Sequence, residues 1–199
     1  MRGGSLYKHL PSFGKRRCKG GKRKAGRITI PDRVDISDRP AVIDLRFRLG
    51  DWEGDTMCGQ DAHLVIFVDR KSRLTLIGKV DTKHAEVVAE SMVKLLKRVS
   101  SVCTVTLDNG GEFAAHEKVA KAMNAGIYFA KSYASYQRGA NENTNGIIRR
   151  TWPKKMVLSH LTKDDVRAMG MLINTMLRKV LGGWAPLEVY TEQPIALIA

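Results

Sequence analysis

Three segments with the sequence character of β-strands, residues 51–58, 63–68 and 74–80, follow one another through connections too short to hold a helix. Parallel strands need a crossover of a dozen or more residues, so this spacing predicts an antiparallel meander. Apolar residues then repeat at 3.6-residue spacing over 83–99, which predicts an amphipathic helix that Thr82 can cap. The chain is therefore constrained to a sheet with at least one helix packed on it.

The second half of the chain adds shorter elements of the same kinds. Residues 102–107 and 127–130 have the pattern of two further strands, with a helical segment over 113–123 between them. Thr162 and Asp165 have the spacing of a capping box ahead of a closing helix. That helix takes its apolar face from Val166, Met169, Ile173, Met176, Leu177 and Val180. Together the elements predict an α/β domain whose five-stranded mixed sheet is flanked by helices.

The first predicted strand carries a carboxylate on every second residue. In a strand, Asp51, Glu53 and Asp55 share one face, while Trp52 and Thr56 share the other. Two interpretations are open. The three acids form the solvated face of an edge strand, or at least one of them binds a metal ion. Periodicity does not decide between the three side chains.

Asp108 follows directly on the strand predicted over 102–107 and precedes Asn109-Gly110-Gly111. An acid at the carboxyl end of a buried strand lies on the rim of a sheet, where ligands bind in open α/β folds. The glycines allow a tight turn and a close approach of a polyanion to the backbone. An Asx-turn or a helix N-cap at Asp108 explains the same residues equally well.

The stretch 137–150 reads Q-R-G-A-N-E-N-T-N-G-I-I-R-R and has one acid, Glu142, among three asparagines and two glycines. If Glu142 stands at a helix start, Arg138, Asn145 and Arg149 lie on its face at spacings of four, three and seven residues, respectively. A carboxylate placed in this way can bind a metal ion while the other groups bind phosphates.

Positive charge is concentrated at the beginning of the chain. The net charge is +14, and residues 1–50 hold 14 Lys and Arg against four Asp and Glu. Residues 1–27 contain ten Lys or Arg, no acid and six glycines, which predicts an extended basic arm. The arm either binds nucleic-acid phosphates or is a solubilising tail or linker. Its candidate phosphate-binding residues are Lys15, Arg16, Arg17, Lys22, Arg23 and Lys24. We expect a partly disordered arm and lead-in over 1–49 and a core over 50–199.

Membrane insertion and secretion are not expected. No apolar run approaches the roughly 18 residues of a membrane span, and no apolar segment of a signal peptide follows the basic start. Cys18, Cys58 and Cys103 are odd in number and form no C-x-x-C pair, which indicates reduced intracellular thiols. We expect a cytoplasmic protein.

Three motifs, in order, carry a resemblance to a known family. They are G-D-W-E-G-D-T, D-N-G-G-E-F and Q-R-G-A-N-E-N-T-N-G, with V-D-R-K-S-R and L-R-K-V-L-G-G-W-A-P-L-E-V in support. In this order and spacing they resemble the DDE catalytic domain of the insertion sequence thirty family of bacterial transposases. The resemblance implies an RNase H-like fold of the retroviral-integrase type and metal-dependent DNA cleavage and strand transfer. Carried over by position, Asp55, Asp108 and Glu142 become the catalytic acids and metal ligands.

The resemblance also implies cofactors and partners. Three carboxylates can hold two Mg²⁺ or Mn²⁺ ions, and the partners become double-stranded DNA, as element ends and target, and further copies of the chain at the bacterial nucleoid. Residues assigned to positioning DNA or the acids are Asn109, Arg138, Asn141, Asn143 and Arg149, although the asparagines can also cap the Glu142 helix.

The sequence departs from the family pattern in three places, and two alternative functions stay open. The family's N-terminal helix-turn-helix region has no counterpart, so we expect a C-terminal fragment or truncated copy whose activity is impaired. Ser135-Tyr136 and the stretch 174–179 differ from the family pattern. Two alternative functions are a non-catalytic DNA-binding remnant that modulates a full-length transposase, and an RNase H-like nuclease.

Overall fold

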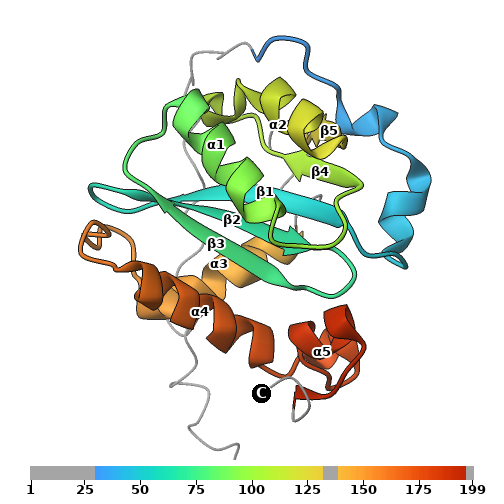
Figure 1. The fold of residues 1–199 in the computed structure, drawn as a ribbon, viewed down its shortest axis with the longest axis vertical. Coiled ribbons are helices and arrows are strands. Elements are labelled where there is room, and N and C mark those ends of the chain that lie inside the picture. Colours follow the sequence, from blue (N-terminus) through green and yellow to red (C-terminus); the bar gives the residue numbers. More distant parts are fainter. Residues whose placement is uncertain (1–29, 132–138, 196–199) are drawn as a thin grey trace, which may run out of the picture.

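The computed structural model of the protein describes residues 30–131 and 139–195. Its centre is a five-stranded sheet with the strand order β3-β2-β1-β4-β5 (Figure 1). The first three strands pair antiparallel, while β1 pairs parallel with β4 and β4 with β5, which confirms the predicted mixed sheet. The strands are β1 (Asp51–Cys58), β2 (His63–Asp69), β3 (Thr75–Val80), β4 (Thr104–Leu107) and β5 (Gly126–Phe129).

Helices cover both faces of the sheet (Figure 1). One face carries α1 (Ala85–Leu96) and α2 (His116–Met123), and the other carries α3 (Gly139–Thr151) and α4 (Lys163–Thr175). A short α5 (Pro186–Thr191) packs against α4. The 3₁₀ turns are η2 (Ile36–Asp38), η3 (Ala41–Leu45), η4 (Gly111–Phe113) and η6 (Lys179–Leu181).

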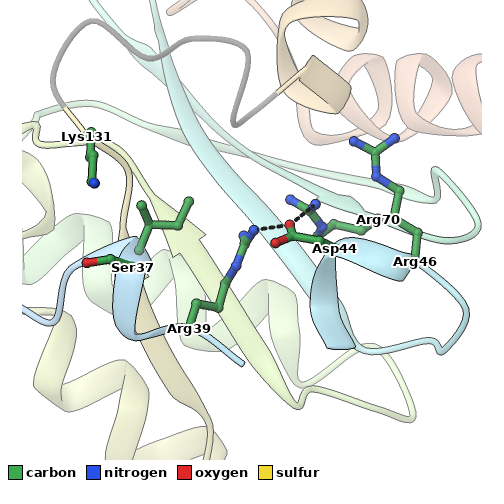
Figure 2. A pocket seen from close by; sticks show the side chains of 7 residues that line it. Ser37, Arg39, Asp44, Arg46, Arg70 and Lys131 are labelled. Atoms are coloured by element: carbon green, nitrogen blue, oxygen red, sulfur yellow. Dashed lines mark hydrogen bonds and ion pairs between the residues drawn. The ribbon is translucent and has the colours of Figure 1, made fainter. Parts of the chain in front are cut away.

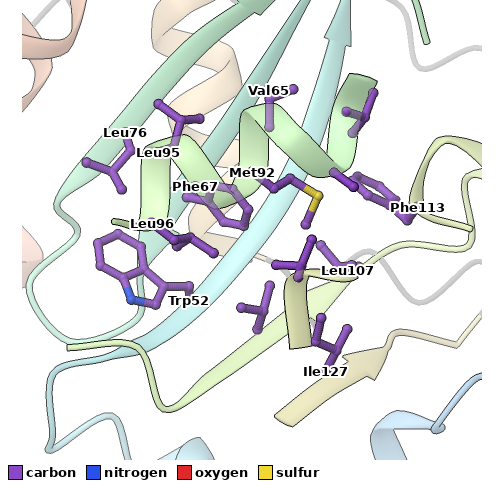
Figure 3. Close-up of a cluster of buried hydrophobic side chains, with 14 of the residues drawn as sticks. Trp52, Val65, Phe67, Leu76, Met92, Leu95, Leu96, Leu107, Phe113 and Ile127 are labelled. Carbon is purple, nitrogen blue, oxygen red and sulfur yellow. The ribbon is translucent and has the colours of Figure 1, made fainter. Parts of the chain in front are cut away.

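The alternation of side chains along β1 divides the interior into two cores. Trp52 points to the α1 side, where it joins Phe67 and Leu107 beneath Met92 of α1 (Figure 3). Met57, five residues later and of opposite parity, joins the core on the α3 and α4 side. Asp51, Glu53 and Asp55 have the parity of Met57, so the acids of β1 lie on the face that α3 covers.

Gly54 lets β1 pass close beneath its neighbours on the α1 side. A Cβ atom at this position would lie 2.6 Å from Cδ2 of Leu107 and 2.8 Å from Cε1 of Phe67. Both contacts are shorter than a real Cβ tolerates, so a side chain at position 54 would force the buried Leu107 and Phe67 side chains, or β1 itself, to shift. The glycine is therefore a packing requirement one residue before Asp55.

Three helices differ from the predicted bounds. The helix expected over 113–123 is α2, which begins at His116 after the 3₁₀ turn η4. The helix expected over 83–99 is the shorter α1, and its N-cap is His84, without a side-chain hydrogen bond, in place of Thr82. The capping box of Thr162 and Asp165 is confirmed, but α4 ends at Thr175. The adjacent Asn174 exchanges hydrogen bonds of 2.8 and 2.9 Å with the backbone of Thr75, which fixes the helix end against β3.

The rest of the predicted apolar face of this helix is wrong. Met176 is already extended, and Leu177 and Val180 are 69% and 66% exposed. The apolar pattern continued past Thr175, but the helix did not, because its end is set by the contact of Asn174 with β3.

The lead-in from residue 30 packs along the parallel edge of the sheet. The N–H of Phe129 donates to the carbonyl of Val34 at 2.9 Å, and Arg39 donates to Oγ1 of Thr106 at 2.9 Å. The basic arm, with Lys15, Arg16, Arg17, Lys22, Arg23 and Lys24, lies outside the described residues, so its proposed role and the boundary at 49 remain predictions.

The structure bears on two predictions, that no segment spans a membrane and that the cysteines are reduced, over its described residues alone. Over 30–131 and 139–195, no helix has the length and apolar character to cross a bilayer. Cys58 and Cys103 are free thiols, and Cys18 lies outside the described residues.

Candidate functional site

Two of the three acids on β1 are buried and paired with arginine. Asp51 accepts hydrogen bonds of 2.8 and 2.9 Å from Nε and Nη2 of Arg48 and one of 2.7 Å from Oγ1 of Thr104. Glu53 accepts 2.8 Å from Nη1 of Arg70. Because β1 is the central strand and both carboxylates are buried, the interpretation of a solvated edge-strand face is wrong. Asp51 and Glu53 stabilise the fold.

Asp55, the third acid of this face, is half-buried near the end of β1. Its Oδ1 accepts from the backbone N–H of Thr56 at 2.9 Å, and its Oδ2 accepts from Nδ2 of Asn145 at 2.7 Å. Asn145 belongs to α3, so this contact joins the helix that carries Glu142 to the strand that carries Asp55. The Glu53 carboxylate also meets this helix, through the backbone N–H of Asn141 at 3.3 Å, whereas Asp55 is bound by the side chain of Asn145.

Asp108 follows β4, the parallel neighbour of the strand that carries Asp55. The parallel pairs of β1 and β4 are Asp51 with Thr104, Trp52 with Val105 and Glu53 with Thr106. The ladder ends there, and the same register extended by two residues would bring Asp108 opposite Asp55, on strands about 4.8 Å apart. The register therefore directs the two acids predicted from separate motifs toward the same end of the sheet.

The turn after β4 confirms the Asx-turn interpretation of Asp108, while ligand binding by this acid stays a prediction. Oδ1 of Asp108 accepts from the N–H of Gly110 at 3.0 Å, which is the Asx-turn contact, while the residue also stands at the sheet rim. Nδ2 of Asn109 donates to the carbonyl of Ala130 at 2.6 Å, next to the end of β5. Asn109 thus ties the acid-bearing turn to the neighbouring strand.

Glu142 is exposed in the first turn of α3. The helix is fixed across β1 at two points, because the N–H of Asn141 donates to Oε2 of Glu53 at 3.3 Å and Asn145 donates to Asp55. Residues three apart share a helix face, so Glu142 lies on the side of α3 from which Asn145 reaches Asp55. The arrangement brings the three predicted acids to one region of the molecule.

Within the described residues, several amide nitrogen and oxygen atoms of α3 have no hydrogen-bond partner. Both side-chain polar atoms of Asn141 and Oδ1 of Asn145 are buried without a hydrogen bond. Buried polar atoms are nearly always paired in native proteins, so unpaired ones call for an explanation such as water, an ion or a ligand. The unpaired atoms of α3 lie beside Glu53 and Asp55, at the predicted site.

The three carboxylates are of the type that binds divalent cations, but their side chains do not converge on one point. Asp and Glu oxygens are the ligands that Mg²⁺ and Mn²⁺ prefer, and Asp55 and Asp108 come from the adjacent strand β1 and the turn after β4. In the described part of the chain, no three His, Cys, Asp or Glu side chains are arranged to hold a metal ion. The third carboxylate, that of Glu142, is exposed and must turn toward the pair to complete such a site.

Basic hollows flank α3 on two sides. A cavity of about 560 Å³ is lined by Asn145 and Arg149 together with Thr56, Met57, Cys58, Gly59, Gly146, Lys154 and Lys155. Arg149 crosses to β1 and donates to the carbonyl of Cys58 at 2.7 Å, and burial lowers the pKa of its guanidinium. Asn143 is exposed and lines a second cavity, of about 300 Å³, with Arg46, Arg73 and Arg178. Arg138 lies outside the described residues.

Glu112 contributes to this region without having been predicted, although it is part of D-N-G-G-E-F. Glu112 accepts hydrogen bonds from Oγ1 of Thr56 and, at 2.6 Å, from Nζ of Lys83. Burial raises the pKa of this carboxyl, but the hydrogen bonds from Lys83 and Thr56 outweigh burial, and the pKa is lowered overall. An acid four residues after Asp108 was the available signal. Its partner Thr56 directly follows Asp55, so Glu112 supports the end of β1 from the opposite face.

The sequence also did not predict that an arginine of the V-D-R-K-S-R motif and one of the lead-in bind the acids of β1. Arg70 binds Glu53, and Arg48 binds Asp51. The alternating charges of the lead-in gave no indication of a partner, because each contact depends on how distant segments pack.

Comparison with known proteins agrees with the motifs. No protein-family model matches the chain. The chain is 41% identical over 194 residues to the transposase for insertion sequence element IS4351 of Bacteroides fragilis, which covers 96% of this chain and 60% of the relative. It is 35% identical over 192 residues to the transposase InsI for insertion sequence element IS30A of Escherichia coli K12, covering 95% and 49%. The chain thus spans about half to three fifths of the length of these relatives.

Solved structures share the fold at low sequence identity. The catalytic core domain of bovine immunodeficiency virus (BIV) integrase superposes with a TM-score of 0.55 at 19% identity, over 75% of this chain and 99% of that chain. A chain from the simian T-cell lymphotropic virus intasome in complex with PP2A regulatory subunit B56 gamma gives a TM-score of 0.59 at 16% identity, over 70% and 53%. These similarities confirm the predicted RNase H-like fold of the integrase type.

The sequence relatives match nearly all of this chain, and one of them is the transposase of the insertion sequence element IS30A. The fold expected of that family is the one observed. Over the part that it shares with these relatives, the chain is homologous to transposases of the insertion sequence thirty (IS30) family.

Proposed function

We propose that this chain is the catalytic domain of a DDE transposase, which cleaves DNA and joins the resulting 3′-ends to target DNA. One observation carries the proposal. Asp51 and Glu53 are engaged by arginines, whereas the Asp55 carboxylate accepts a hydrogen bond from the Asn145 side chain of the Glu142 helix. The register of β1 and β4, extended by two residues, would bring Asp108 opposite Asp55. Asp55 therefore has a different kind of hydrogen-bond partner from Asp51 and Glu53, the two acids of the same strand that are paired with arginines.

The proposed reaction has two steps of the same kind. In cleavage, a water oxygen attacks a phosphorus atom of DNA, the bond from phosphorus to the 3′-oxygen breaks, and a 3′-hydroxyl and a 5′-phosphate result. In strand transfer, that 3′-hydroxyl attacks a target phosphodiester and displaces its 3′-oxygen. Asp55, Asp108 and Glu142 would hold two Mg²⁺ or Mn²⁺ ions, which when bound activate the attacking oxygen and stabilise the leaving one.

The side chains around the acids have positioning roles in this proposal. Asn145 holds the Asp55 carboxylate in one orientation through its 2.7 Å hydrogen bond. Asn141 and Asn109 hold the start of α3 and the turn of Asp108 through their contacts with Glu53 and Ala130. Asn143 and Arg149 line the hollows on either side of α3 and would contact DNA.

The proposed partners are double-stranded DNA, as element ends and target, and further copies of the chain. A net charge of +14 supports a polyanionic partner. The basic-arm residues and Arg138 would add phosphate contacts. Support for assembly on DNA is by analogy, since the similar viral chain belongs to an intasome. With DNA as substrate, the protein would act in the bacterial cytoplasm at the nucleoid.

A second candidate function is a DNA-binding remnant without catalysis. The exposed position of Glu142 and the absence of a closed three-acid cluster over 30–131 and 139–195 favour it. An RNase H-like nuclease uses the same acids and differs in its substrate and products.

One assay separates these functions. The purified protein is incubated with labelled element-end duplexes, a target plasmid and an RNA–DNA hybrid, in Mg²⁺ or Mn²⁺. Cleaved ends joined to the plasmid support the transposase. Hybrid cleavage without joining identifies the nuclease. Salt-sensitive DNA binding with neither product at any metal concentration identifies the remnant.

A further inference from the structure

A cationic cavity of about 450 Å³ lies on the acid-bearing face of the sheet (Figure 2). It is lined by Ile36, Ser37, Arg39, Asp44, Arg46, Arg70 and Lys131. The lead-in supplies most of these residues, Arg70 comes from the end of β2, and Lys131 follows β5. Figure 2 shows Asp44 between Arg39 and Arg70, with Lys131 and Arg46 on opposite sides of the hollow.

The lining carries more positive than negative charge. Four cationic side chains line the cavity, and Asp44 is the one acid among the lining residues. Asp44 is shared between Arg39 and Arg70, and Glu53 binds Arg70 from beneath. Even with both carboxylates counted, two positive charges remain. Such an excess favours an anionic ligand.

Two of the arginines are held in place with unused donors. The side chains of Arg39 and Arg70 are 5% and 4% exposed, and the Nε of each is buried without a hydrogen-bond partner. Leaving a buried donor unpaired is costly, more so on a charged group. Burial, together with the neighbouring Arg39 and Arg46, lowers the pKa of Arg70. The planar guanidinium fork matches a phosphate group, which can satisfy several donors at once.

The cavity is connected to the acid pair through the strands themselves. Arg39 donates to Thr106, two residues before Asp108 on β4, and Arg70 donates to Glu53, two residues before Asp55 on β1. Two strand residues correspond to about 7 Å. Arg46 also lines the cavity that contains Asn143 and Arg178, so positive side chains continue from the hollow toward the start of α3.

We propose that this cavity binds one phosphodiester group of a DNA strand that runs past Asp55 and Asp108. The proposal rests on the function proposed above and adds a specific anchoring site. Arg39 and Arg70 form its fixed floor, while the exposed Arg46 and Lys131 close on the phosphate from either side. The continuation of positive charge along α3 favours an extended polyanion over a small free anion.

The test neutralises the exposed half of the site and leaves its buried half intact. The cavity variant is Arg46→Asn with Lys131→Gln, because Arg46 has a φ of 54° and Asn tolerates this conformation well. The matched control is Lys97→Gln with Lys121→Gln, two exposed lysines of the α1 and α2 side. Both variants lose two positive charges, so general electrostatic attraction changes equally.

Fluorescence anisotropy of a labelled duplex is measured in EDTA between about 50 and 200 mM salt. The slope of log K against log salt should fall in magnitude by about 1 in the cavity variant, the value for one lost phosphate contact, and stay near wild type in the control. Equal slopes for the two variants would overturn the proposal. So would loss of inorganic phosphate binding in the cavity variant with unchanged duplex binding, which identifies a small-anion site.

Failure of this inference and failure of the proposed function give different results. If the wild type cleaves and joins DNA while the cavity variant matches the control, the anchoring site alone is wrong. If the wild type neither cleaves nor joins DNA, the proposed function is wrong, whatever the slopes are.

Discussion

Nδ2 of Asn145 donates a 2.7 Å hydrogen bond to Oδ2 of Asp55 and so connects the helix of Glu142 to the central strand of the sheet. The two residues are 90 positions apart in the chain. Asp51 and Glu53, on the same strand face, are bound by arginines instead. In the proposed function, this difference in partners distinguishes Asp55, as a metal ligand, from the two acids that stabilise the fold.

Replacing Asn145 by Ala should impair catalysis through the orientation of Asp55. Partners that orient metal-binding side chains typically contribute 10- to 100-fold, so we expect DNA cleavage to fall by about 10- to 100-fold and half-saturation to need more Mn²⁺. Mn²⁺ titrations of the cleavage rate measure both effects. DNA binding in EDTA should be unchanged, and Asn145→Ser should recover part of the activity. An unchanged Mn²⁺ dependence would show that Asn145 has only a structural role.

Gly146 and Gly170 form a matched pair of helix glycines. A Cβ at either position would meet nothing within 4 Å, so Gly→Ala should stabilise the protein by about 0.5–1 kcal/mol at each site. Gly146 lines the basic hollow with Asn145 and Arg149, whereas Gly170 lies on α4. We expect Gly146→Ala alone to weaken DNA cleavage, because its methyl group narrows the approach to Asp55. Urea unfolding and cleavage assays measure the two effects, and equal activity of the variants would remove Gly146 from the DNA-contacting surface.

The ion pair of Glu53 and Arg70 should control stability. Arg70→Met leaves Glu53 buried without its cation and should reduce the free energy of unfolding by about 3–5 kcal/mol. The double variant Arg70→Met with Glu53→Met should recover most of this loss, because both buried charges are removed together. Urea unfolding of the single and double variants provides the measurement. A loss below about 1 kcal/mol in Arg70→Met would show that water screens Glu53.

Glu112 should make stability depend on pH in the acidic range. Its folded-state pKa is lowered from the ordinary value of 4.5, so its ionised form stabilises the fold. This contribution is fully present above the unfolded pKa and is lost as the pH falls through the lowered folded pKa. The free energy of unfolding of Glu112→Gln should therefore be below that of wild type at pH 7, with the difference shrinking as the pH falls below 4.5. A difference independent of pH would assign the effect to packing.

The sequence predicts most of the fold because its elements are encoded locally. The meander follows from short connections, and the apolar spacing of 85–96 gives α1. The end of α4 was misplaced because it depends on the contact of Asn174 with Thr75, which lie 99 residues apart in the chain. Local pattern contains no information about such a contact.

The acids of the candidate site could be predicted from the sequence, but the contacts that distinguish them from one another could not. Alternation placed Asp51, Glu53 and Asp55 on one face, and only the motif resemblance selected Asp55. The physical reason for the selection is tertiary, since Arg70 reaches Glu53 and Asn145 reaches Asp55 from distant segments. The hollow formed by Arg39, Arg46, Arg70 and Lys131 had no signal in the sequence, because the lead-in, β2 and β5 come together only in the folded chain.

The central claim is that Asp55, Asp108 and Glu142 act together on DNA. Single-turnover cleavage of a labelled element-end duplex in Mn²⁺ tests it, with Asp55→Asn, Asp108→Asn and Glu142→Gln beside the exposed α1 control Glu90→Gln. Each site variant should lose on the order of 10³-fold or more in rate while keeping DNA binding, because several kcal/mol of transition-state stabilisation are removed. The control should cleave at the wild-type rate. Wild-type cleavage by any one of the three site variants would contradict the account.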